Sequence, residues 1–342
     1  MRSFSVLAGL AIFTSELASA ETPKKPASGW EQVLHAGEKF GPRDEAKGLV
    51  LGEGMWLRGG TPGGSDLLYD TWFSADGANW SRRDENDRDG NEKVHSYSLL
   101  VSVDRKTMLG IEDGKVFQFD APRWTAVAGG QGFRRPEAAV VADKTIFCLD
   151  RDPPRAQDGV QKGRLWSSAD GGKTWTIVND NVPFGPRRPN AMAAFKGKLW
   201  VIGGVGDADR PALPTEYYPW KMYNDVWSSG DGGKTWRKSA VKQEWVPRNW
   251  AGSASDAERM WIVGGFDNIL KKDRIADLND VWSSQDGEHW VSQGPGGFTP
   301  RHAPTCYIHD GYLWVVAGKE NTTPSSGRHT NDVWRLRLPG RK

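Results

Sequence analysis

The chain has 342 residues, a formal net charge of +2 and 41 glycines. A charge so close to zero gives no global basic field of the kind that nucleic-acid-binding proteins carry, so we expect no nucleic-acid partner. Only two cysteines are present, which excludes a disulfide framework and leaves stability to a packed core.

Residues 1–20 have the pattern of a secretory signal peptide. Arg2 gives a positive start, residues 4–13 are apolar, and Ala18-Ser19-Ala20 is a small-residue cleavage site. The apolar run is too short to span a bilayer, and no later run is long enough. We therefore expect cleavage before Glu21, a secreted or periplasmic protein, and no membrane insertion.

After the signal peptide, three short phrases recur along the chain. An apolar run ending in a glycine pair occurs at 54–60, 198–204 and 259–265, and one ending in Ala-Gly at 312–318, with weaker copies at 106–111 and 144–149. A phrase with tryptophan at its third position follows at 70–74, 164–168, 225–229, 280–284 and 332–336, and it begins with aspartate in every copy except 164–168. A third phrase pairs proline with arginine, at 42–43, 134–136, 187–189, 247–248 and 300–301. β-branched and aromatic runs that end in glycine indicate buried strands followed by turns.

The three phrases define a unit of four antiparallel strands, repeated about every 40 to 60 residues, which is typical of a β-propeller blade. Blades are expected over 43–80, 95–124, 135–175, 188–236, 248–290 and 301–338. The sixth lacks its outermost strand, and residues 30–34 supply one, because a closed ring leaves no sheet edge exposed. Residues 21–342 are therefore predicted to form one domain, an all-β, six-bladed β-propeller closed by an N-terminal strand in the last blade.

The order of glycine pair, Asn-Asp-Val-Trp, tryptophan strand and Pro-Arg resembles the kelch repeat. The turn between the third and fourth strands resembles the Asp-box of sialidase-like propellers, in full at 168–175 and 229–236 and one residue shorter at 74–80 and 284–290. In such a turn the aspartate accepts backbone N–H bonds, glycine supplies a positive φ, and tryptophan packs between blades. We interpret these residues as structural.

Arginines at the start of the innermost strands are the main binding candidates. They are expected to ring the channel mouth: Arg43, Arg135, Arg188, Arg248 and Arg301, with His95 nearest the equivalent place in blade two. The kelch resemblance implies that axial arginines grip acidic ligands, and a guanidinium binds a carboxylate in a bidentate way. The alternative is that each arginine pairs with an acid such as Asp44, Glu45 or Glu137 and only locks the ring.

A long connection in the fourth blade is the second candidate. It carries Tyr217, Tyr218 and Trp220 beside acidic residues, and aromatic faces next to charges suit sugars or peptides. The alternative is a lid that packs on its own ring.

These features favour a non-catalytic module that binds an anionic glycan or acidic peptide at the axial funnel, with no cofactor and no metal. The alternative is an enzyme on sialic-acid-like sugars. Exported six-bladed kelch propellers include sialic acid mutarotases, so the resemblance implies a mutarotase or epimerase, which needs an acid, a base and a carboxylate clamp. A sialidase-type hydrolase has less support, because neither its Tyr–Glu pair nor three clamp arginines can be placed.

The histidines and cysteines show no metal-binding pattern. Cys148 and Cys306 fall inside expected strands of opposite blades, which is too far apart for a disulfide. We expect two free, buried thiols.

Overall fold

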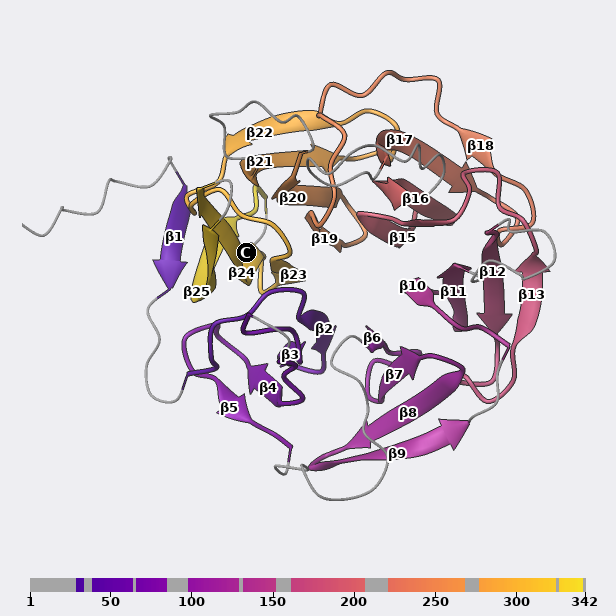
Figure 1. Ribbon diagram of the computed structural model, residues 1–342, viewed down its shortest axis with the longest axis horizontal. Coiled ribbons are helices and arrows are strands. Elements are labelled where there is room, and N and C mark those ends of the chain that lie inside the picture. The colour runs from indigo at the N-terminus through magenta and orange to yellow at the C-terminus, as the bar shows by residue number, and fades with distance from the viewer. Residues whose placement is uncertain are drawn as a thin grey trace, which may run out of the picture.

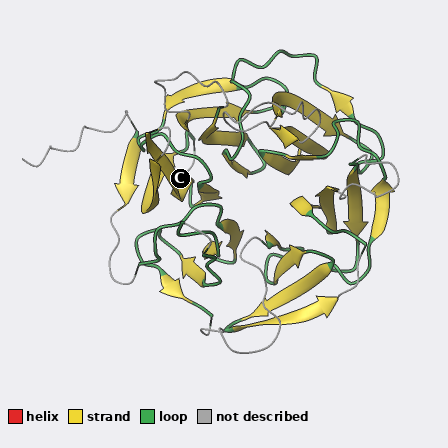
Figure 2. Cartoon of the chain, viewed as in Figure 1, coloured by secondary structure: helices red, strands yellow, loops and turns green. Residues whose placement is uncertain are grey.

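The computed structural model describes residues 29–33, 39–63, 66–84, 98–128, 132–151, 161–206, 221–267, 277–323 and 326–340. Six sheets stand around a central axis as the blades of a propeller, with the first strand of each blade innermost (Figure 1). None of the described residues lies in a helix (Figure 2), so among them there is no helix that could cross a membrane.

The blades follow one another in chain order. Blade one contains β2 (Lys47–Leu51), β3 (Gly54–Arg58), β4 (Thr71–Ser74) and β5 (Ser81–Arg82). Blade two contains β6 (Leu99–Val101), β7 (Met108–Glu112), β8 (Lys115–Asp120) and β9 (Arg123–Ala128). Blade three contains β10 (Pro136–Ala142), β11 (Thr145–Arg151), β12 (Gly163–Ser168) and β13 (Thr176–Asn179). The prediction of an all-β propeller built from antiparallel four-stranded units is confirmed.

Blade four contains a short extra strand, β14 (Arg187–Arg188), besides β15 (Ala191–Phe195), β16 (Lys198–Gly206), β17 (Lys221–Ser229) and β18 (Arg237–Lys238). Blade five contains β19 (Gly252–Ser255), β20 (Met260–Phe266), β21 (Asp277–Ser284) and β22 (Val291–Pro295). Blade six contains β23 (Thr305–His309), β24 (Tyr312–Thr323), β25 (Ser326–Arg337) and, as its outermost strand, β1 (Trp30–Val33).

The N-terminal strand closes the ring as predicted. β1 pairs antiparallel with β25, with Trp30 opposite Leu336 and Val33 opposite Val333. The Trp30 ring is buried and meets Phe298 edge-on at 5.3 Å between centroids. Residue 34, the end of the predicted strand, lies outside the described residues.

Deleting residues 21–36 is expected to leave β25 as an unpaired edge and to remove the Trp30 side chain from the core. The variant should aggregate and melt well below the parent in thermal unfolding followed by light scattering. A deletion of residues 21–28, which spares β1, is the matched control. An unchanged melting temperature for the longer deletion would contradict the closure.

The turns between the third and fourth strands lock neighbouring blades together. In blade four the carboxylate of Asp231 accepts hydrogen bonds from the hydroxyl and the backbone N–H of Thr235, which lowers its pKa to about 2. Gly233 has a φ of +89°, and a Cβ there would stand 2.1 Å from Leu165 of blade three. The tryptophan that follows, Trp236, lies directly before β18 and donates its indole N–H to the Gly233 carbonyl. The carboxylate of the turn aspartate therefore accepts hydrogen bonds within its own hairpin and has a structural role.

The two cysteines are free. Cys148 is buried in β11 of blade three and Cys306 is half-buried in β23 of blade six, on opposite sides of the ring. Burial raises the pKa of both thiols, so neither has the character of a reactive thiolate.

Candidate functional site

The arginine of the Pro-Arg phrase is tied into its own blade. Its guanidinium pairs with the aspartate of the Asp-x-Trp phrase, and the tryptophan of that phrase donates its indole N–H to the same carboxylate. The four triads are Arg43–Asp70–Trp72, Arg187–Asp225–Trp227, Arg248–Asp280–Trp282 and Arg301–Asp332–Trp334. We call these four arginines the framework arginines.

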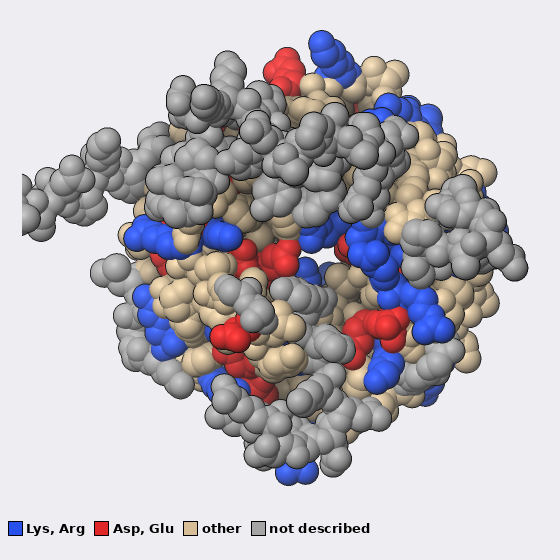
Figure 3. Space-filling view, in the orientation of Figure 1, with Lys and Arg blue, Asp and Glu red and all other residues tan. Residues whose placement is uncertain are grey.

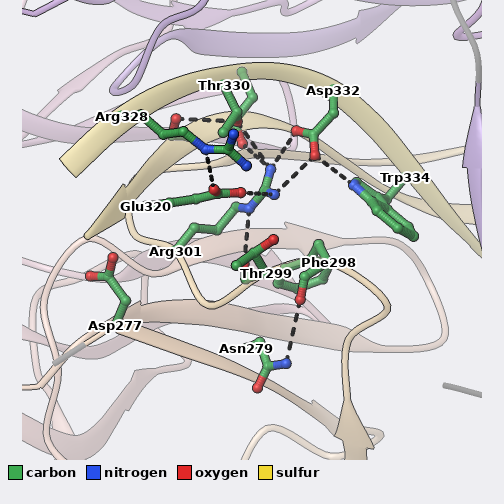
Figure 4. A network of polar contacts seen from close by, with 12 residues as sticks. Asp277, Asn279, Phe298, Thr299, Arg301, Glu320, Arg328, Thr330, Asp332 and Trp334 are labelled. Carbon is green, nitrogen blue, oxygen red and sulfur yellow. Dashed lines mark hydrogen bonds and ion pairs between the residues drawn. The ribbon is translucent and has the colours of Figure 1, made fainter. Parts of the chain in front are cut away.

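Arg301 shows how completely such a residue is paired (Figure 4). Its guanidinium donates to both oxygens of Asp332 at 2.5 and 2.9 Å and to Glu320 at 2.7 Å. Its remaining donors reach the Thr299 and Ala317 carbonyls. No donor is left for a ligand.

The structure therefore does not bring the predicted ring of five arginines to the channel mouth. Arg43, Arg248 and Arg301 are framework arginines with at most 1% of the side chain exposed. In blade four the framework position belongs to Arg187, and Arg188 is the residue after it. The acids that hold the framework arginines lie in the same blade and are not those that the sequence-based alternative named, whereas Arg188 does pair with one of those, Glu45 of blade one. Burying a guanidinium requires a partner within hydrogen-bonding distance, and the Asp-x-Trp strand supplies it.

Blade three departs from this arrangement. Arg135 is exposed, and its backbone N–H donates to Asp150 at 2.6 Å. The Asp-x-Trp aspartate is replaced there by Arg164, which pairs with Asp180. His95, Tyr217, Tyr218 and Trp220 lie outside the described residues.

The residues just after the framework arginines meet near the axis. They approach closely because the glycine pair of the next strand has no side chains: a Cβ on Gly60 would stand 2.4 Å from the Asp44 carbonyl oxygen. Glu45 and Trp250 both have φ near +50°. Backbone hydrogen bonds connect the blades here: the N–H of Ala303 donates to the carbonyl of Trp250, and the N–H of Glu45 donates to the carbonyl of Ala303. We define the axial cluster as Asp44, Glu45, Arg188, Asn249, Trp250, His302 and His329.

Arg188 is the cation of this cluster. Its guanidinium stands 4.8 Å from the centroid of the Trp250 ring, donates to Glu45 at 3.1 Å and reaches Asn249 at 3.5 Å. The Trp250 indole N–H donates to the same Glu45 carboxylate. Arg188 keeps 31% of its side chain exposed. These contacts join blade one to blades four and five, from which it is distant in the sequence.

His302 is held by a carboxylate. Its Nδ1 lies 2.8 Å from Asp277, whose side chain is fully buried and also accepts two hydrogen bonds from Asn321. The imidazole packs against the rings of Trp250 and Phe266, at 5.5 and 5.7 Å between centroids. A carboxylate on one ring nitrogen fixes the orientation of a histidine and leaves the other nitrogen for a second partner.

Asp44 is the most perturbed acid of the cluster. Burial, reinforced by the charge of Glu45, raises its pKa to about 6, although His302 and Lys319 act against the rise. Its Oδ1 lies 3.4 Å from Nε2 of His329. Burial and the nearby Lys319 and His302 lower the pKa of His329. Asp44 can therefore gain or lose a proton near pH 6, about two units above the range of an ordinary aspartate.

Basic and acidic side chains also lie next to the axial cluster. Burial lowers the pKa of Lys47 on β2, while the charges of Glu45 and Glu137 act in the other direction. Figure 3 shows the central opening with basic and acidic side chains on its rim. Among the described residues, no group of three or more His, Cys, Asp or Glu side chains is arranged to hold a metal ion.

Sequence reasoning missed Trp250, His302, His329 and Asn249, and a signal for three of them was present. The framework arginine recurs in four of the six blades, whereas the next two positions change from one of these blades to another: Asp-Glu, Arg-Pro, Asn-Trp and His-Ala. A position that differs from blade to blade is not required for the structure that all the blades share. Such a position next to the axis is therefore a candidate for ligand binding.

Comparisons with known proteins place few limits on function. No protein-family model matches the chain. The Drosophila melanogaster protein named leucine-zipper-like transcriptional regulator 1 homolog is 24% identical over 173 residues, which is 48% of this chain and 16% of that protein. The chain thus aligns with about a sixth of that relative's length.

Proposed function

We propose that this propeller is an exported, kelch-like module with Asp-box turns that binds a carboxylate-bearing ligand, an acidic glycan or an acidic peptide, at the axial cluster. The observation that carries the proposal is the state of Arg188. Unlike the framework arginines, it is partly exposed and is held by one carboxylate oxygen and one long contact. Its guanidinium lies over an aromatic face, so a ligand carboxylate can take donors from Arg188 while the body of the ligand contacts Trp250.

A binding screen of the protein starting at Glu21 tests this proposal. Calorimetry against sialic acids, uronates and acidic peptides should find saturable binding that neutral sugars do not give. Arg188→Ala should weaken it by roughly 2 kcal/mol, about thirtyfold in Kd. Arg237→Ala, which removes an exposed arginine from the outer strand of the same blade, is the matched control. Equal loss in both variants, or binding that ignores the ligand's carboxylate, would contradict the proposal.

A second function is favoured by the pairing of His302 with Asp277. A histidine oriented by a buried carboxylate, beside an acid whose pKa is about 6, is suited to proton transfer on a sugar held by Arg188. The reaction would be a mutarotation or epimerisation of an acidic sugar. Anomer exchange of sialic acids and uronates, followed by NMR, should be accelerated by the parent and lose roughly a hundredfold or more in His302→Ala. No acceleration over buffer by the parent would leave only the binding function.

A further inference from the structure

Blades three and four carry an arginine at the same position of the repeat. Blade three repeats at 134–136 the Arg-Arg-Pro sequence of blade four, so Arg135 corresponds to Arg188. The strands agree with this alignment, because Arg135 is seven residues before Ala142, the end of β10, and Arg188 is seven residues before Phe195, the end of β15. β10 begins directly after Arg135 and contacts β14, which ends at Arg188. The two arginines therefore lie on neighbouring innermost strands.

Arg135 has no carboxylate partner among the described residues. Blade three lacks the aspartate that a framework arginine needs, because Arg164 replaces it. The acids close to the start of β10 are already engaged: Glu137 pairs with Arg151 at 2.7 Å, and Asp150 accepts backbone N–H groups. The Arg135 side chain is exposed, and in the described part of the chain it forms no ion pair or hydrogen bond. All of its donors are therefore available to a ligand.

Lys47 is a further cation at the axis. It lies on β2, the innermost strand of blade one, and the charges of Glu45, Glu137 and Arg188 act on it. These groups belong to blades one, three and four, which come within reach of a single charge only around the axis of the ring. Burial, with a smaller contribution from Arg188, lowers the pKa of Lys47, and no described carboxylate forms an ion pair with it. An additional anion nearby would therefore favour its charged form.

The ion pairs leave an excess of basic groups on this side of the opening. Glu45 is held by Arg188 and Glu137 by Arg151, so neither acid is left to pair with Arg135. Figure 3 shows basic side chains extending from the central opening toward the side on which β10 and β11 lie in Figure 1. Positive charge gathered at an opening attracts an anionic ligand and raises its association rate.

We propose that the axial ligand is an acidic oligosaccharide with a carboxylate on each of two successive sugar units, one bound by Arg188 and the other by Arg135. This inference rests on the proposed binding of a carboxylate at the axial cluster and adds the second anionic group. A sugar fits better than a peptide for two reasons. The Trp250 ring beside Arg188 offers an aromatic face to a sugar ring. A sugar ring also holds its carboxylate rigidly, whereas glutamate side chains lose rotamer freedom on binding.

Calorimetric titrations of the protein starting at Glu21 with galacturonate and digalacturonate measure the second contact. Digalacturonate should bind roughly tenfold more tightly than galacturonate, because its second carboxylate binds at a high effective concentration. Its monomethyl esters, which keep one carboxylate, should lose this advantage. Arg135→Ala should also remove the advantage and leave the Kd of galacturonate within about twofold of the parent. Arg135→Lys, which keeps the charge but not the fork, should retain part of it.

Two further variants complete the series. Arg188→Ala should weaken both sugars, and Arg237→Ala, which removes an exposed arginine from the outer strand of blade four, should weaken neither. Arg135→Ala should keep the melting temperature of the parent, because its side chain is exposed and unpaired among the described residues. A loss of binding in this variant is then a loss of contact with the ligand.

Equal Kd values for galacturonate and digalacturonate, or an advantage that survives Arg135→Ala, would overturn the second contact and leave the proposed function intact. If neither sugar binds, the inference fails, and the proposed function fails with it only if sialic acids and acidic peptides are not bound either. Binding of triglutamate that depends on Arg135, without binding of digalacturonate, would overturn the assignment to a sugar.

Discussion

Replacing Arg43 with alanine is expected to lower the free energy of unfolding by about 3–5 kcal/mol, the range for breaking a buried ion pair. Arg43 donates to both oxygens of Asp70 at 2.6 and 2.8 Å and is 1% exposed. Burial by itself would raise the pKa of Asp70, and the hydrogen bonds from Arg43 and Trp72 hold it below its usual value. Without Arg43 a charged carboxylate remains in a site that water hardly reaches.

Denaturant unfolding at pH 7 of a graded series measures this effect. Arg248→Ala should cost less than Arg43→Ala, because its partner Asp280 is 32% exposed and Asp70 only 13%. Arg188→Ala should cost least, since its pair with Glu45 is partly hydrated. Equal losses for Arg43→Ala and Arg188→Ala would mean that the framework and axial arginines do not differ in role.

Asp44→Asn is expected to stabilise the protein by up to about 3 kcal/mol at pH 7 and to have little effect at pH 3. The pKa of Asp44 is raised from 3.8 to about 6 on folding. Between these values the unfolded chain has lost the proton and the folded protein has kept it, so the stability contributed by this group falls as pH rises from about 4 to 6. An asparagine does not ionise, so the free energy of unfolding of the variant does not fall in this way as the pH rises. The charged groups that act on Asp44 are Glu45, His302, His329 and Lys319.

The turn aspartates give a control of opposite sign. The side-chain and backbone donors of Thr174 lower the pKa of Asp170 to about 2. Its stabilisation is present above pH 4 and lost as pH falls toward 2. Asp170→Asn should therefore destabilise the protein at pH 7, and its difference from the parent should shrink in acid. Chemical denaturation at pH 3, 5 and 7 measures both variants, and a stabilising effect of Asp44→Asn that does not grow with pH would contradict the perturbed carboxyl.

The sequence by itself determined the architecture. Strand phrases, turn residues and glycine pairs recur at fixed places because every blade has the same strands and turns and packs against its neighbours in the same way. Residues 30–33 could be assigned to the last blade from sequence, since a ring without a closing strand exposes an edge.

The tertiary structure alone decided which arginines are buried and which face the axis. Arg187 and Arg188 are adjacent and chemically identical, and only the register of β14 on β16 gives Asp225 to one and Glu45 of blade one to the other. The contact of His302 with Asp277 likewise joins two blades. Such partners are far apart in sequence and are selected by where the closed ring brings the blades together, so no local pattern contains them.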